Sequence, residues 1–209
     1  MIRIFEMGKI RDEEIFARFE PTSSVEDIVK DIIARVRAEG DAALRAYSAE
    51  FDHVDLQDFL VSEAEMQAAL EKVEPEFIAV LEEAAANIRA FHSKQVRNSF
   101  IMADKPGVIL GQRVIPLEKV GLYVPGGTAA YPSTVLMDSI PAKIAGVEEI
   151  VMVTPPNKEG SVNPYILAAA HVAGVGRIFK VGGAQAVAAL AYGTESIPRV
   201  DKIVGPGNA

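Results

Sequence analysis

The chain changes its pattern of apolar and polar residues near its midpoint. Before residue 104, apolar side chains recur at the three- and four-residue spacing of helices that bury one face. After residue 107, short runs of Val, Ile and Leu alternate with Gly- and Pro-containing loops and with Ala-rich stretches. We therefore predict two regions, a mainly helical one over residues 1–105 and an α/β one over residues 106–209.

The first region predicts four helices. Ser23 and Ser24 precede acidic residues, which is a helix-start signature, and Gly40 is placed to end the first helix. The later helices are predicted to begin at residues 42, 62 and 75, and the last one extends to about residue 99. Pro75 fits this scheme because proline is tolerated in the first turn of a helix.

The second region predicts an alternation of strands and helices. Strands are expected at residues 108–110, 114–117, 120–124, 150–153, 178–181 and 202–204, and helices at 133–145, 164–173 and 184–191. The first two strands are interpreted as a hairpin through Gly111-Gln112. The other four, which alternate with helices and are rich in Val and Ile, predict a parallel sheet buried on both faces. The fold class is α/β, with a helical N-terminal region followed by an incomplete Rossmann-like parallel sheet.

Composition and charge exclude several function classes. The sequence has 209 residues with a net charge of −8, which argues against nucleic acid as a partner. Gly, Pro or charged residues interrupt every long apolar stretch, and the first residues do not resemble a signal peptide, so we expect no membrane association and a cytoplasmic location. The absence of cysteine excludes disulfides, thiolate–zinc sites and cysteine nucleophiles.

Three Gly-rich loops follow predicted parallel strands, at residues 123–128, 181–186 and 205–208. Ligands in open α/β sheets bind at this edge, where glycine allows close backbone approach. Tyr123 offers a ring that stacks and a hydroxyl, Gln185 both donates and accepts, and Asn208 can bond a ribose or an amide. None of the loops is a dinucleotide fingerprint or a P-loop. A tyrosine packed under its loop, a solvated first-turn glutamine and a turn-supporting asparagine remain the alternatives.

Catalytic and metal-binding residues are not predicted. His53, His92 and His171 are widely separated, and no pair of them has metal-ligand spacing. No Ser/His/Asp arrangement accompanies a sharp nucleophile turn either. The residues alone thus indicate a ligand-binding edge without catalytic machinery.

Long runs around these loops are similar to the histidinol dehydrogenase family. They cover residues 120–129, 133–137, 141–142, 181–196 and 200–208, with a looser similarity at 36–44. The resemblance implies an aldehyde-dehydrogenase-like architecture in an intertwined homodimer. It also implies oxidation of L-histidinol through the aldehyde to L-histidine with two NAD and one zinc. The family's NAD-contacting Tyr, Gln and Asn match Tyr123, Gln185 and Asn208.

The chain departs from this family in its length. Members are about twice as long, and their zinc ligands, catalytic Glu–His pair and substrate-binding Ser and Gln follow the Gly-Pro-Gly-Asn loop. The chain is thus expected to be a truncated N-terminal part, inactive alone and with no zinc ligands of its own. A non-catalytic nucleotide-binding or dimerisation module is the alternative. Val29, Ile33, Leu81 and Ile88 are expected on uncovered helix faces, which self-association would hide.

Overall fold

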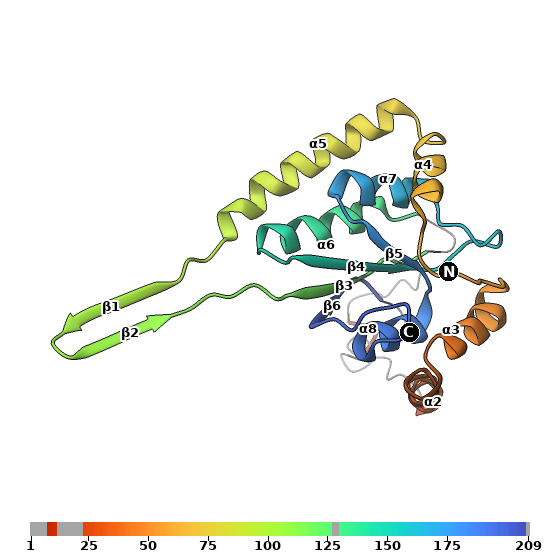
Figure 1. Ribbon diagram of the computed structural model, residues 1–209, viewed down its shortest axis with the longest axis horizontal. Coiled ribbons are helices and arrows are strands. Elements are labelled where there is room, and N and C mark those ends of the chain that lie inside the picture. Colours follow the sequence, from red (N-terminus) through yellow and green to blue (C-terminus); the bar gives the residue numbers. More distant parts are fainter. Residues whose placement is uncertain (1–7, 12–22, 127–129, 208–209) are drawn as a thin grey trace.

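A computed structural model describes residues 8–11, 23–126 and 130–207 of the chain. Four parallel strands form a central sheet with helices on both faces, and one hairpin extends away from this body (Figure 1). The predicted class, helices followed by a parallel sheet, is confirmed.

The N-terminal helices are α2 (Ser23–Glu39), α3 (Asp41–Tyr47), α4 (Glu63–Leu70) and α5 (Pro75–His92). Gly40 separates α2 from α3 with a φ of 56°, and a π-helical turn, Ser48–Asp52, follows α3. The side chains of Ser23 and Ser24, predicted to start the first helix, lie outside the described part. The predicted extension of the last helix to residue 99 is wrong, because α5 ends at His92 and only a 3₁₀ turn, Ser93–Gln95, follows.

The sheet contains β3 (Lys119–Tyr123), β4 (Glu149–Thr154), β5 (Arg177–Lys180) and β6 (Lys202–Val204) in the order β5-β4-β3-β6. The crossovers carry α6 (Pro132–Ile144), α7 (Pro164–Ala173) and α8 (Gly183–Tyr192). All seven predicted elements are confirmed to within one or two residues. Their pattern is readable because the central residues of a doubly covered strand are apolar, as the fully buried run Val151–Val153 shows.

Two apolar cores lie on opposite faces of the sheet. Ile150 and Met152 of β4 face the core with α4, α5, α6 and α7, whereas Val151 and Val153 face the core with α2, α3 and α8. Helices from the first 105 residues therefore complete both cores. The segment before α4 also pairs with β5, the outer strand of the sheet, since the N–H of Lys180 donates to the carbonyl of Phe59 at 2.7 Å.

A hairpin of β1 (Phe100–Lys105) and β2 (Val108–Gln112), here called the arm, extends beyond the body, and all residues of both strands are exposed (Figure 1). The predicted hairpin between 108–110 and 114–117 is wrong, because β2 pairs with the preceding strand and 114–117 forms no strand. The turn uses Gly107, whose φ is 76°. Gly111 lies within the strand instead, where a Cβ would stand 2.7 Å from the carbonyl oxygen of Phe100.

The predicted exposed helix faces are covered by this chain in part. Leu81 is buried at 4 % exposure, so its predicted exposure is wrong, and Ile33 and Ile88 pack against the two cores. The most exposed large apolar residues are Ile101 and Ile109 of the arm, at 79 % and 76 %. Among the described residues, no helix combines the length and apolar character needed to cross a membrane.

Candidate functional site

The loops that follow all four parallel strands meet at one edge of the sheet. Because β3, β4, β5 and β6 run in the same direction, their carboxyl ends share this edge. The loops after β3, β5 and β6 contain glycine within three residues of the strand end, and a proline directly follows β4. The loops approach one another so closely that side chains at the glycines would collide.

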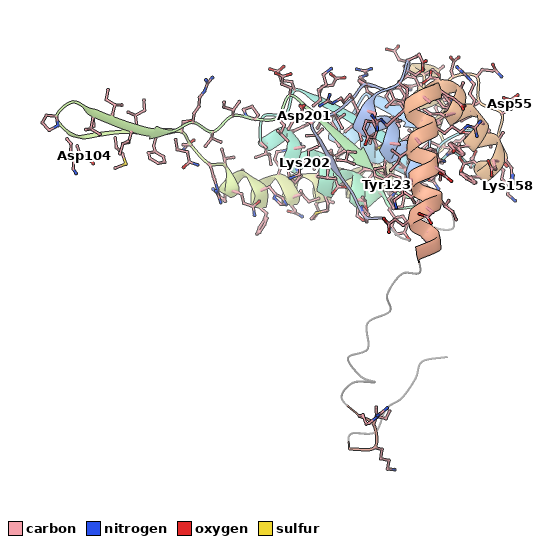
Figure 2. The ribbon with its side chains drawn as sticks, turned by 90° about the horizontal axis from the view of Figure 1, so that it is seen from below. Asp55, Asp104, Tyr123, Lys158, Asp201 and Lys202 are labelled. Carbon is pink, nitrogen blue, oxygen red and sulfur yellow. The ribbon has the colours of Figure 1, made fainter. Side chains whose placement is uncertain are left out.

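Tyr123 connects the loop after β3 to the loop after β5. Its hydroxyl accepts a hydrogen bond from the N–H of Gly183 at 3.2 Å. Gly183 is the first residue of α8, so this N–H is one of those that a helix leaves unpaired at its start. The Tyr123 side chain, in the body of the molecule in Figure 2, is half-buried and also packs against the core beneath α8.

Gln185 lies in the first turn of α8 and is only 2 % exposed. This burial contradicts its alternative interpretation as a solvated side chain. Gly183 makes room for it: a Cβ on Gly183 would lie 2.6 Å from Oε1 of Gln185, and the φ of Gly183 is 67°. The amide is therefore held against the start of the helix, close to the N–H that Tyr123 accepts.

Pro155 separates two of the glycine loops. A Cβ added to Gly126 or to Gly182 would approach Pro155 to 2.6 Å. The sequence interpretation did not single out Pro155, although a Pro-Pro pair directly after a buried strand was a usable signal. The proline ring fixes the spacing between the loops after β3 and β5 because it fills the volume between them.

The loop after β6 lies against the end of β3. Gly205 has a φ of 139°, and a Cβ there would collide with the carbonyl oxygen of Tyr123. Asn208, the third predicted site residue, lies outside the described residues. The structure thus brings together Tyr123, the start of α8 with Gln185, and the loop that leads to Asn208.

A partly buried ion pair lies at the end of β5, next to this edge. Nζ of Lys180, the last residue of β5, lies 2.8 Å from Oε1 of Glu65 on α4, and the lysine side chain is 8 % exposed. Glu65 also completes a capping box with Ser62. Burial alone would raise the pKa of Glu65, but the hydrogen bonds from Lys180 and Ser62 outweigh it and lower that pKa below its ordinary value. The pair fixes α4 beside the strand that leads into the Gly182-Gly183 loop.

The described residues do not offer a metal site. No three His, Asp or Glu side chains among them gather as ligands would. Nδ1 of His92 lies 2.7 Å from Oε1 of Gln95 on the surface, and His171 is exposed on α7. The described residues alone therefore offer no set of ligands that would hold zinc.

Comparisons with known proteins agree with this geometry. The sequence model of the family described as histidinol dehydrogenase matches residues 17–209. The chain belongs to the histidinol dehydrogenase family. The histidinol dehydrogenase of Clostridium acetobutylicum is 52 % identical over all of this chain, and that of Listeria monocytogenes serovar 1/2a is 58 % identical over 88 % of it. A crystal structure of histidinol dehydrogenase from Elizabethkingia anophelis matches 91 % of the chain with a TM-score of 0.87 and 40 % identity.

The chain spans about half the length of these histidinol dehydrogenases. It covers 49 % of the Clostridium protein, 43 % of the Listeria protein and 44 % of the Elizabethkingia chain. It corresponds to the N-terminal half of the family, as the sequence predicts.

Proposed function

We propose that this chain supplies the NAD-binding part of a histidinol dehydrogenase, which oxidises L-histidinol through the aldehyde to L-histidine. The observation that carries the proposal is the meeting of Tyr123, the start of α8 and the Gly205 loop at one sheet edge. Sheet edges of this kind are where nucleotides bind in open α/β folds. Family membership supplies the choice of nucleotide and substrate.

The chain's own residues have separate parts in this proposal. The unpaired N–H groups at the start of α8 and the backbone of the glycine loops would hold the pyrophosphate. Tyr123 would pack against a flat ring or hydrogen-bond through its hydroxyl, Gln185 would bond an amide or hydroxyl, and Asn208 would bond the ribose. NAD supplies a hydride acceptor when bound.

Zinc and the proton-transferring groups are proposed to come from the family's second half, because the described residues hold no cluster that would bind the metal. We thus propose no oxidation by these 209 residues alone. Homodimeric assembly, histidinol as the small-molecule partner and a cytoplasmic location complete the proposal, as the sequence and the family resemblance imply.

A non-catalytic nucleotide-binding or dimerisation module is the second candidate. The exposed apolar arm favours it, because such a surface is suited to assembly. The two candidates share the sheet edge and differ in whether a complete enzyme forms around it.

Calorimetric titration of the purified chain with NAD tests the proposed site. We expect saturable binding with a Kd of about 1 mM, because part of a site gives little affinity. ATP is the control, since it carries the phosphates without the nicotinamide. Absence of saturation by NAD, or equal binding of both nucleotides, would count against a site for NAD.

A further inference from the structure

Pro155 directly follows β4, at the point where this strand stops pairing with both of its neighbours. β4 lies between β5 and β3 in the sheet. Its last pair with β5 joins Thr154 to Lys180, and on the other side the carbonyl of Val153 accepts the N–H of Val124 at 2.9 Å. Proline has no N–H, so the strand cannot donate a further ladder bond at this position. The three strands therefore separate at Pro155, and the loops after β3 and β5 begin on either side of it.

The proline ring contacts the two loops through different atoms. A Cβ on Gly126, in the loop after β3, would lie 2.6 Å from Cγ and 3.2 Å from Cδ of Pro155. A Cβ on Gly182, in the loop after β5, would lie 2.6 Å from Cβ and 3.2 Å from Cα of the same proline. Neither glycine has a φ in the left-handed region. The need for glycine at both positions thus comes from contact with Pro155 and not from the backbone conformation.

A proline is well suited to keep two loops apart. Its ring fixes φ, and its burial costs almost no rotamer entropy, whereas a long flexible side chain in this place would move aside. The hydrogen bond from Gly183 to the Tyr123 hydroxyl joins the same two loops. The bond therefore draws the loops together, and the ring sets how closely they approach.

A dinucleotide and a mononucleotide depend differently on this separation. In the proposed site, NAD contacts Tyr123 at the end of β3 and Gln185 at the start of α8, so it spans both loops. A mononucleotide such as AMP makes the contacts of one half of NAD only. A ligand that spans two loops loses affinity when their separation is no longer fixed, because binding must then restore it. A ligand held by one loop does not have this cost.

We infer that Pro155 is a positioning residue that makes the sheet edge selective for a dinucleotide, because its ring holds the loops after β3 and β5 at the separation that NAD spans. The inference rests on the proposed NAD site and adds the residue that sets its selectivity. Pro155 contacts no reacting atom in this scheme, and it acts through the loops of Gly126 and Gly182.

Two proline variants separate the ring from other effects of a substitution. Pro155→Ala removes Cγ and Cδ, which limit the approach of Gly126, and keeps the Cβ that contacts Gly182. Pro156→Ala is the matched control, since this half-buried proline is the next residue and is not among the nearest neighbours of either glycine. Both changes give the unfolded chain similar additional freedom.

A glycine variant and a double variant test the contact itself. Gly126→Ala places a methyl group against the intact ring. In the double variant Pro155→Ala/Gly126→Ala, that methyl group takes the place of the ring atoms that have been removed. Titrations with NAD and with AMP are followed through the amide signals of Gly182 and Gly183 in proton–nitrogen correlation spectra, and Tm is measured for each variant.

We expect the Kd for NAD to rise about five- to tenfold in Pro155→Ala and in Gly126→Ala, and less than about twofold in Pro156→Ala. The double variant should return to within about twofold of the wild type. The Kd for AMP should change less than about twofold in every variant. Gly126→Ala should also lower Tm by about 4 °C or more, because the methyl group overfills the space beside the ring, and the second substitution should recover most of that loss.

Three results would overturn the inference and leave the proposed NAD site in place. One is a Kd for NAD that rises no more in Pro155→Ala than in Pro156→Ala. Another is an equal loss of affinity for NAD and AMP. The third is a double variant that binds NAD as weakly as Gly126→Ala. If Gly126→Ala does not fold, the two proline variants decide, because they only remove atoms. A wild type whose signals do not respond to NAD would overturn the proposed function, and the inference with it.

Discussion

The hydroxyl of Tyr123 accepts the N–H of Gly183 at 3.2 Å and so joins the end of β3 to the start of α8. This bond holds two of the glycine loops at a fixed separation. The tyrosine is therefore both a candidate ligand contact and a support of the loops around it.

Tyr123→Phe should weaken NAD binding by about three- to tenfold, because the loops lose an order that binding must then restore. The free energy of unfolding should fall by about 0.5–1.5 kcal/mol, the usual net contribution of one hydrogen bond. Calorimetric titration and urea unfolding measure the two effects. Tyr192→Phe, at the other end of α8, is the control. Equal losses of NAD affinity and unfolding free energy in both variants would contradict the role of the Tyr123 hydroxyl.

Gly205→Ala should destabilise the chain by about 2–4 kcal/mol, because the new Cβ collides with the carbonyl oxygen of Tyr123 and the φ of 139° suits only glycine. Gly207→Ala is the control two residues away, since nothing lies within 4 Å of its Cβ position. Its effect should stay within about 0.5 kcal/mol. Thermal unfolding compares the two variants. A similar loss of stability in both would mean that Gly205 is not closely packed.

Glu65→Gln should lower stability at neutral pH by about 1–2 kcal/mol, because Lys180 stays buried without its anionic partner. The value lies below that of a fully buried pair because the Glu65 side chain is 35 % exposed. Since folding lowers the pKa of Glu65, its contribution is present above the ordinary value of 4.5 and is lost as the pH falls through the lower folded pKa.

Urea unfolding from pH 7 down to pH 3 measures this difference. The difference in unfolding free energy between the wild type and Glu65→Gln should become smaller below about pH 4.5. Glu63→Gln on the same helix is the control, and its unfolding free energy should stay close to that of the wild type at every pH. If Glu65→Gln lost the same unfolding free energy at every pH, the ion pair would not be the cause of that loss.

Asp138→Asn should stabilise the chain on its own at neutral pH, with a rise in Tm of about 2–4 °C. Burial raises the pKa of Asp138, so the wild type loses stability as the pH rises from the ordinary value of 3.8 through the folded pKa. The gain should therefore disappear below about pH 3.8. Asp104→Asn in the arm is the exposed control, and a gain that persists at low pH would point to a cause other than charge.

The chain alone should form no NADH from L-histidinol, with or without added zinc. The described residues contain no metal cluster, and we propose that the proton-transferring groups lie in the family's second half. NADH formation is followed by its absorbance, and a full-length relative is the positive control. Sustained turnover by the purified chain would contradict the assignment of catalysis to the second half.

The sequence predicted the sheet better than the arm for a physical reason. Strands such as β4 are covered on both faces by this chain, so their apolar runs and their neighbours are encoded together. The arm was assigned the wrong partner strand because none of its residues is covered here, and its pattern then carries no information about pairing. Leu81 was expected at the surface, although α5 packs against α6 and α7 and buries it in their shared core.

At the candidate site, the sequence located the residues but not their contacts. Tyr123 and Gln185 were singled out by their places at strand and helix ends, whereas the bond from Gly183 to Tyr123 spans 60 positions and depends on the fold. The contact of Pro155 with two glycines and the pairing of Glu65 with Lys180 were missed for the same reason.

The sharing of both cores between early and late segments has a consequence during synthesis on the ribosome. The carbonyl of Phe59 and the side chain of Glu65 both bind Lys180, which is synthesised more than 110 residues after them. At ordinary translation rates this interval lasts roughly 6–24 s. The early helices emerge long before their sheet exists, so the nascent chain is a substrate for chaperones that shield apolar helices until β5 appears.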